Sequence, residues 1–195
     1  FPTRRSSDLD MAYSQNDEEK YILDYFKGFT GTLIDIGAND GKTFSNSKAL
    51  IDLGWSAILY EPSPSAYLAC KQLHVNNKKV KIINKAITDS YGDMTFYDSS
   101  DTLLSSLKKE LSERSPSKEI KVKCVPYSEI KSPADFITID AEGMDFIIIK
   151  QIDLTNVKMI CIEHGNSFEK EAKEYCEGFG MKQLMRNYEN IIMVK

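Results

Sequence analysis

The sequence of 195 residues has no apolar run of about 18 residues, the length that a membrane-spanning helix requires. It also lacks a basic start followed by an apolar core, which is the pattern of a secretion signal. Its four cysteines show no C-x-x-C spacing of the kind found in zinc sites, so we expect reduced and mostly buried thiols. Together these absences predict a soluble cytoplasmic protein with no membrane partner.

Positive charge is not in excess either. Lys and Arg number 25 against 29 Asp and Glu, which gives a formal net charge of −4. A nucleic-acid-binding protein usually has a broad basic surface, so no nucleic-acid partner is expected. The local group of Lys78, Lys79 and Lys81 is interpreted as a solvated turn between a helix and a strand.

Residues 1–9, FPTRRSSDL, differ in character from the rest of the chain. They look like the translation of a sequencing-adapter oligonucleotide, and we interpret them as a non-native tail. The chain is 42% apolar, which is enough for one α/β domain over residues 10–195, whereas two domains would be small.

The most informative segment is LIDIGANDGKT, residues 33–43. Its apolar start predicts a buried parallel strand, and Gly37 and Gly41 allow a tight turn against which a ligand can lie. The dinucleotide pattern G-x-G-x-x-G is absent, because Asn39 stands where the middle glycine often falls. Asp35 suits the cationic methionine end of S-adenosylmethionine (SAM) better than a pyrophosphate. An ordinary strand-to-helix turn is the alternative interpretation.

A second apolar strand, residues 56–60, ends in Glu61, which follows Gly41 by 20 positions. In a doubly wound sheet the end of this strand lies beside the first turn, so the carboxylate of Glu61 can accept hydrogen bonds from both hydroxyls of a ribose. A solvated surface glutamate is the alternative.

The rest of the chain alternates between apolar strands and amphipathic helices. The first helix opens with a capping-box pattern of Asn16 and Glu19. Helices are expected over 16–26, 45–53, 64–75, 144–152 and 168–177. Strands are expected over 80–87, 94–97, 120–125, 134–140 and 157–162, with a terminal hairpin of 181–186 and 191–194. The predicted fold is therefore an α/β, Rossmann-like doubly wound sheet, mostly parallel, with an antiparallel C-terminal strand.

The stretch 98–118 is rich in Ser, Asp and Lys around a weak helical piece at 103–111. Such an insertion is a candidate substrate lid. A loop without a role fits the residue types equally well.

Acidic residues and a histidine follow the two later strands of the predicted sheet. Asp140 and Glu142 come after one strand, and Glu163 and His164 come after the next, so all four are expected around one crevice. His164 is the first candidate for a general base, because the usual pKa of histidine, about 6.5, is near neutral. Asp140 is the second, while His74 is expected mid-helix as an exposed or packing residue. The spacing is not a metal signature, so no metal is assigned.

Several motifs in this order resemble the FkbM-type family of SAM-dependent methyltransferases. The resemblance spans most of the chain and rests on these segments: SQNDEE at 14–19, LIDIGANDGKTFSN at 33–46, GWSAILYEPSPSAY at 54–67, KAITDSYGDMTFY at 85–97, SSL at 105–107, FITIDAEGMD at 136–145 and CIEHG at 161–165. Thr138 and Ala141 depart from the family, which more often has a basic and a branched apolar residue there.

The resemblance implies the class I methyltransferase fold, SAM as methyl donor, and transfer mostly to oxygen of sugars, polyketides or other small molecules. Carried over by position, the first loop would line the methionine and ribose side with Asp35, Gly37, Ala38, Asn39 and Gly41. Glu61 would hold the ribose, Asp89 would approach the adenine, and Asp140 and Glu142 would lie by the methyl-transfer centre.

The leading hypothesis is thus a SAM-dependent methyltransferase that acts on a hydroxyl of a small-molecule or glycan acceptor. The main alternative is a catalytically inactive SAM-binding or interaction protein of the same fold. An NAD-dependent oxidoreductase is a third hypothesis. The oligomeric state is left open.

Overall fold

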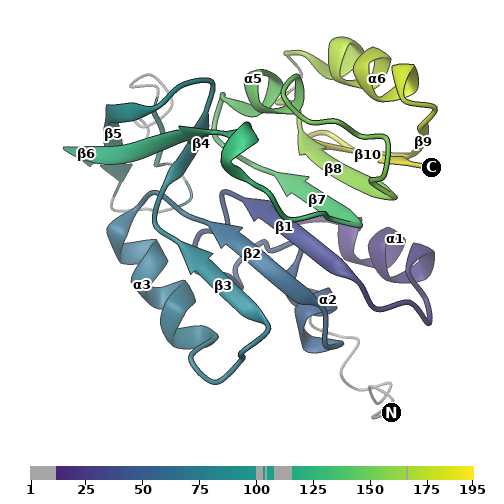
Figure 1. Ribbon diagram of the computed structural model, residues 1–195, viewed down its shortest axis with the longest axis horizontal. Coiled ribbons are helices and arrows are strands. Elements are labelled where there is room, and N and C mark those ends of the chain that lie inside the picture. Colours follow the sequence, from purple (N-terminus) through teal and green to yellow (C-terminus); the bar gives the residue numbers. More distant parts are fainter. Residues whose placement is uncertain (1–11, 100–102, 104, 108–115, 166) are drawn as a thin grey trace.

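The computed structural model describes residues 12–99, 103, 105–107, 116–165 and 167–195 (Figure 1). The proposed tail at 1–9 and most of the weak helical stretch at 103–111 lie outside these residues, so both interpretations stay predictions. No helix in the described ranges is both long enough and apolar enough to cross a membrane.

One large sheet of seven strands organises the chain. Its spatial order is β3 (Val80–Ile83), β2 (Ser56–Tyr60), β1 (Thr32–Ile36), β7 (Phe136–Ile139), β8 (Met159–Glu163), β10 (Asn190–Val194) and β9 (Lys182–Arg186). The first five are parallel to one another, whereas β10 is antiparallel to both β8 and β9. The predicted mostly parallel sheet with an antiparallel C-terminal hairpin is confirmed.

Helices pack on both faces of this sheet, because alternate residues of each buried strand point to opposite sides. On β1, Leu33 packs with α1 (Glu18–Tyr25), α2 (Lys48–Asp52) and α3 (Pro64–Leu73). Ile34 and Ile36 face the other layer, which contains α5 (Asp145–Ile149) and α6 (Glu169–Gly178). Asp35 shares the parity of Leu33 and so points to the α1–α3 side.

A second, three-stranded sheet was not predicted. It has the order β4 (Ala86–Thr88), β6 (Ser117–Pro126) and β5 (Gly92–Ser99), and it lies beyond the carboxyl ends of β1 and β2 (Figure 1). The predicted single strand at 80–87 is wrong, because the chain leaves the large sheet at Asn84. The Asn84 amide there donates to the carbonyl oxygens of Glu61 and Pro62, at 2.8 and 2.9 Å, and ties this crossing to the end of β2.

Local boundaries differ from the prediction in smaller ways. α2 and α5 are each shorter than expected, and a 3-10 helix, η3 (Tyr127–Glu129), follows β6. The capping box of Asn16 and Glu19 is not formed. α1 has Asp17 as its N-cap, while Glu19 exchanges bonds with the preceding turn: its N–H donates to Ser14 Oγ at 3.1 Å, and its carboxylate accepts from Tyr13 N–H at 2.7 Å.

Candidate functional site

The loop after β1 is shaped by its glycines. Gly37 has a φ of 89°, and a Cβ at this position would lie 1.7 Å from the carbonyl oxygen of Asp140. Only glycine fits there, because the β1 loop and the β7 loop touch through their main chains. Gly41, with a φ of 78°, serves a different contact, since its Cβ would lie 2.7 Å from Cys70 Sγ on α3. Gly41 therefore allows the loop to pack closely against α3.

Glu61 stands at the end of β2, next to the same loop. Its carboxylate accepts hydrogen bonds from the N–H groups of Ser63, at 2.7 Å, and Asn39, at 2.8 Å. The side chain is buried, and burial raises the pKa of Glu61 to about 7, although these two N–H donors lower it. A carboxylate oxygen has two lone pairs, so each oxygen can still accept a bond from a ligand.

A cavity with about 620 Å³ of empty space joins the ends of β1, β2 and β7. The β1 loop contributes Gly37 and Asn39, β2 contributes Glu61, and the β7 loop contributes residues 140–142. The wall on the far side comes from residues 85–87, Phe96, Leu103, Ser105 and Leu107. It lies at the carboxyl edge of the sheet, where doubly wound folds bind their ligands.

Three predicted cofactor residues do not line this cavity. Asp35 is buried on the α2 side, where Ser47 Oγ donates to it at 2.6 Å, and burial raises its pKa to about 6 despite this bond. Ala38 and Gly41 also point away from the cavity, Ala38 being buried in the cluster with α1 and α2. These residues pack on the side of the loop that is turned away from the cavity.

Asp89 is likewise outside the cavity. It is exposed and accepts a hydrogen bond from Ser90 Oγ at 3.1 Å. The residues that face the cavity from this part of the chain are Ala86 and Ile87, with Phe96 from β5. They were missed because the sequence did not reveal the small sheet, although the apolar alternation around Phe96 was visible.

The β7 loop and the end of β8 bring three carboxylates together. Oxygens of Asp140, Glu142 and Glu163 all lie within 4.8 Å of one another, and Glu142 adopts a positive φ of 47°. Asp145 fixes the turn, because its carboxylate accepts the N–H groups of Ala141 and Gly143 at 2.6 and 2.9 Å. Acidic groups at such a spacing are common without an ion, so the cluster alone defines no metal site.

Asp140 and Glu163 are joined by a hydrogen bond between their side chains. Desolvation by the surrounding protein atoms, and next the charge of Asp145, raise the pKa of Asp140 to about 7, although the residue keeps access to solvent. Burial, and next the charge of Asp140, raise the pKa of Glu163 well above its usual range. The two carboxyl groups therefore share a proton near neutral pH. Glu163 was missed as a partner of Asp140 because the two belong to different strands.

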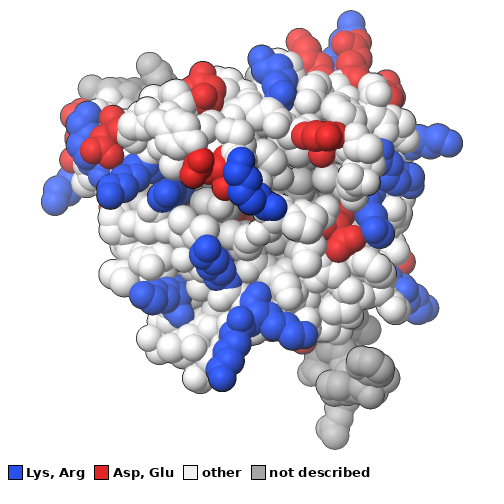
Figure 2. Space-filling view, viewed as in Figure 1, with Lys and Arg blue, Asp and Glu red and all other residues white. Residues whose placement is uncertain are grey.

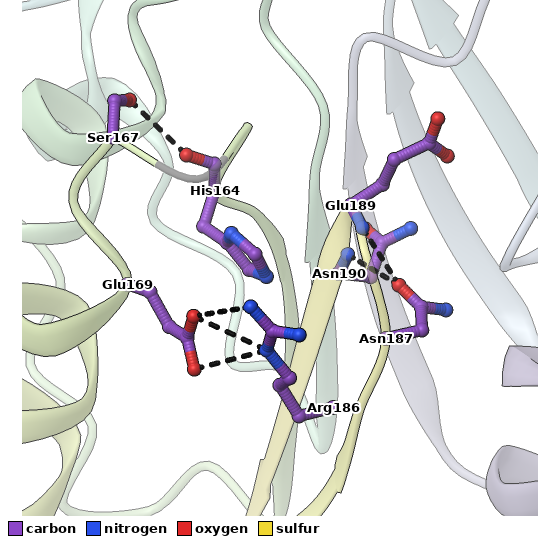
Figure 3. Close-up of polar contacts among 7 residues, drawn as sticks. All are labelled: His164, Ser167, Glu169, Arg186, Asn187, Glu189 and Asn190. Carbon is purple, nitrogen blue, oxygen red and sulfur yellow. Dashed lines mark hydrogen bonds and ion pairs between the residues drawn. The ribbon is translucent and has the colours of Figure 1, made fainter.

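His164 lies apart from this cluster. Figure 3 shows its ring beside Arg186, which forms an ion pair with Glu169 at 2.9 Å, and facing the turn that contains Asn187. The side chain is fully buried, burial lowers its pKa, and it does not line the cavity. The backbone N–H of His164 donates to the carbonyl oxygen of Glu189 at 2.8 Å, which extends the pairing of β8 with β10 to the turn of the β9–β10 hairpin. The structure gives His164 a packing position.

His74, the other histidine, is the C-cap of α3 and is buried beside Gly41. Of the two positions expected for it, exposed or packing, the packing one is confirmed. The structure thus brings together Gly37, Asn39, Glu61, Asp140 and Glu142 from the predicted set.

The cavity has polar chemistry that suits SAM. The Oδ1 atom of Asn39, which lines the cavity, is buried and has no hydrogen-bond partner within the described residues. An unpaired buried acceptor costs roughly 1–3 kcal/mol, and the ammonium and hydroxyl groups of SAM are donors that would satisfy it.

The fold is that of solved methyltransferases, at low sequence identity. The ribosomal protein L11 methylase of Lactobacillus delbrueckii subsp. bulgaricus matches with a TM-score of 0.55 and 11% identity, over 90% of this chain and 74% of that one. The precorrin-6y C5,15-methyltransferase of Geobacter metallireducens gives 0.51 and 11%, over 100% of both chains. Magnesium protoporphyrin IX methyltransferase from Synechocystis, solved with bound SAM, gives 0.50 and 7%, over 100% of this chain and 86% of that one. The chain has the class I methyltransferase fold.

The sequence also matches the methyltransferase FkbM domain over residues 35–191. No curated protein matches it. Because the match covers most of the chain, the protein belongs to the FkbM methyltransferase family, and the predicted resemblance is confirmed. It is a SAM-dependent methyltransferase with SAM as its cofactor, and the oxidoreductase hypothesis is not supported.

Proposed function

We propose that this methyltransferase transfers the methyl group of SAM to a hydroxyl oxygen of a small-molecule or glycan acceptor. The observation that carries the proposal is the cavity between Glu61 and the carboxylates of Asp140 and Glu142. One cavity lined by an acid that can hold the ribose and by an acid that can accept a proton would serve O-methylation, which needs an aligned donor and a positioned base.

In this proposal, different residues of the cavity contact different parts of the cofactor. Glu61 accepts the ribose hydroxyls, and the β1 loop around Gly37 and Asn39 holds the methionine end. Ala86 and Phe96 enclose the adenine. Bound SAM supplies an electrophilic methyl group on a sulfonium, whose positive charge is favoured by the nearby carboxylates.

Asp140 is the proposed general base. It lines the cavity, and a pKa of about 7 leaves it substantially ionised at neutral pH yet basic enough to take a proton. With SAM bound, Asp140 would accept the proton of the acceptor hydroxyl as the oxygen takes the methyl group, the bond from sulfur to methyl breaks and S-adenosylhomocysteine is left. Glu163 keeps the shared proton and so donates a hydrogen bond to Asp140. We propose Asp140 in place of His164, since His164 is not at the cavity.

The test has two stages. First, isothermal titration with SAM, with its demethylated product S-adenosylhomocysteine (SAH), and with NAD should show binding of the first two only. Second, radiolabelled SAM is incubated with a panel of hydroxylated glycans and small molecules, and product label is counted for the wild type and Asp140→Asn. Transfer to an amine or carbon acceptor would contradict the oxygen assignment. SAM binding with no transfer to any acceptor class would favour the inactive SAM-binding alternative.

A further inference from the structure

A row of lysines runs along the edge strand β3, with members before, within and after the strand. We call Lys78, Lys79, Lys81 and Lys85 the lysine stripe. In Figure 2 the blue Lys and Arg side chains predominate over the lower left of the molecule, where β2 and β3 lie, while the upper part mixes both signs. The sequence of this segment, KKVKIINK, contains no acid, and neither does the neighbouring strand β2.

The lysines of β6 show what a balanced arrangement looks like. Lys118 lies opposite Asp98 on β5, and Lys123 lies opposite Asp93. Such cross-strand neighbours compensate charge on the small sheet. In the lysine stripe, the side-chain ammonium groups of Lys78, Lys81 and Lys85 form no hydrogen bond or ion pair with another described residue, so their charge is unbalanced.

The sheet face beside the stripe is only partly covered. Lys81 pairs in register with Ile58 of β2 and points to the same side as Ile83. Ile58 and Ile83 are half-buried at the border of the core cluster that contains α5 and α6, and those helices lie over the other end of the sheet (Figure 1). A partly apolar strip with a lysine border results.

The stripe ends at the cavity. Lys85 lines the cofactor cavity, and it also borders a second hollow with Lys123 and Asp93. Within the stripe, β3 itself runs about 10 Å toward the cavity edge, at the rise of a β-strand. A ligand that lay along the stripe would therefore reach the cavity at one end.

We propose that the lysine stripe binds the carboxylate or phosphate groups of an anionic glycan and directs one end of it into the cavity as the acceptor. This inference rests on the proposed O-methylation and narrows its acceptor to an acidic glycan. The charges of the stripe match the anionic groups, and the half-buried Ile58 and Ile83 match the apolar faces of sugar rings.

Edge protection and nucleic-acid binding are two different roles that a row of lysines could have. Lysines on an edge strand can simply prevent sheets from pairing edge to edge. A nucleic acid also carries anionic groups, but single-stranded binders stack bases on aromatic side chains, and the stripe contains none. Each role predicts its own result in a binding experiment.

The experiment measures fluorescence anisotropy of labelled probes with the full chain. The probes are a hexamer of galacturonic acid, a phosphorylated pentamannose, neutral maltohexaose and an eight-residue oligothymidylate. The test variant is Lys81→Gln/Lys85→Gln. The matched control is Lys182→Gln, an exposed lysine on the opposite edge strand β9. SAM affinity of each variant is titrated in parallel.

We expect one of the acidic glycans to bind and maltohexaose not to bind. The double variant should bind that glycan about ten-fold more weakly, as expected for the loss of two exposed ion pairs, and the control should bind like the wild type. The proposal is overturned if neither acidic glycan binds a chain that still binds SAM. It is also overturned if the control weakens binding equally, or if oligothymidylate binds more tightly. Self-association of the double variant with unchanged glycan affinity would assign the stripe to edge protection. If the wild type itself does not bind SAM, the cofactor assignment is refuted instead.

Discussion

The pKa of Glu61 predicts how cofactor affinity depends on pH. Ribose hydroxyls bind the ionised carboxylate, and the pKa of Glu61 in the free protein is about 7. At pH 8 about nine-tenths of Glu61 is ionised, and at pH 6 about one-tenth, so SAH affinity should fall about ten-fold between them, equivalent to roughly 1.4 kcal/mol. SAM affinity should fall further, because Asp140 also loses the negative charge that faces the sulfonium.

Isothermal titration at pH 6, 7 and 8 checks this prediction. Repeating the pH 6 titration in buffers of different ionisation enthalpy should show release of about one proton when SAH binds. SAH shares the ribose of SAM but has a neutral thioether, so the difference between the two ligands isolates the contribution of the carboxylates around Asp140.

Glu61→Gln is the decisive variant. It should bind SAH more weakly at pH 8, by about ten- to a hundred-fold for bonds to a charged group, and the affinity should no longer change between pH 6 and pH 8. Asp89→Asn, an exposed acid outside the cavity, should keep the wild-type pH dependence. If the pH dependence persisted in Glu61→Gln, or if the wild type had none, the assignment of Glu61 to the ribose would be refuted.

Three other predictions concern the loop, the base and the stability of the fold. Gly37→Ala should abolish SAM binding and lower the melting temperature, because the added Cβ would overlap the Asp140 carbonyl. Gly28→Ala is the control: this glycine also has a positive φ but nothing lies within 4 Å of the added Cβ, so the free energy of unfolding should fall by only about 1 kcal/mol. Equal effects of the two variants would show that the loop contact is not tight. Asp140→Asn should reduce the rate of methyl transfer by about 10²- to 10⁴-fold while SAM still binds, and His164→Gln should retain transfer in any fraction that folds. Single-turnover assays with radiolabelled SAM measure both rates. A larger loss of rate in His164→Gln than in Asp140→Asn would restore His164 as the base. Without SAM, the free energy of unfolding should fall as pH rises from 4.5 to 7, because a raised carboxyl pKa means that the folded state holds the proton more tightly in that window. Glu61, with a usual value of 4.5, would account for about 3 kcal/mol of this loss. Urea unfolding at pH 5 and pH 7.5 tests it, and a rise in stability would contradict the burial of this acid.

Much of the site was predictable because it depends on strand ends. Gly37, Glu61 and Asp140 each follow an apolar strand, and parallel strands of a doubly wound sheet deliver their carboxyl ends to one edge. The mostly parallel sheet and its antiparallel C-terminal hairpin also followed from local periodicity and from the motifs of the family. These features require only short-range information.

The failures concern residues whose neighbours are distant in sequence. Asp89 was expected near the adenine, but β4 pairs with β6, which begins about thirty residues later, and this pairing leaves Asp89 exposed. His164 follows a strand end as Asp140 does, yet the β9–β10 hairpin covers it.

The sequence by itself determined the sheet, its glycine turn and the acids at its edge, because alternation of apolar residues and the position of a strand end are properties of a local segment. Only the tertiary structure decided which of those side chains meet. The hydrogen bond between Asp140 and Glu163 depends on how β7 and β8 are placed side by side, and the cavity wall of Ala86 and Phe96 depends on a small sheet formed by distant strands. Burial and charge proximity, which set the pKa values in the site, arise only after these segments have packed.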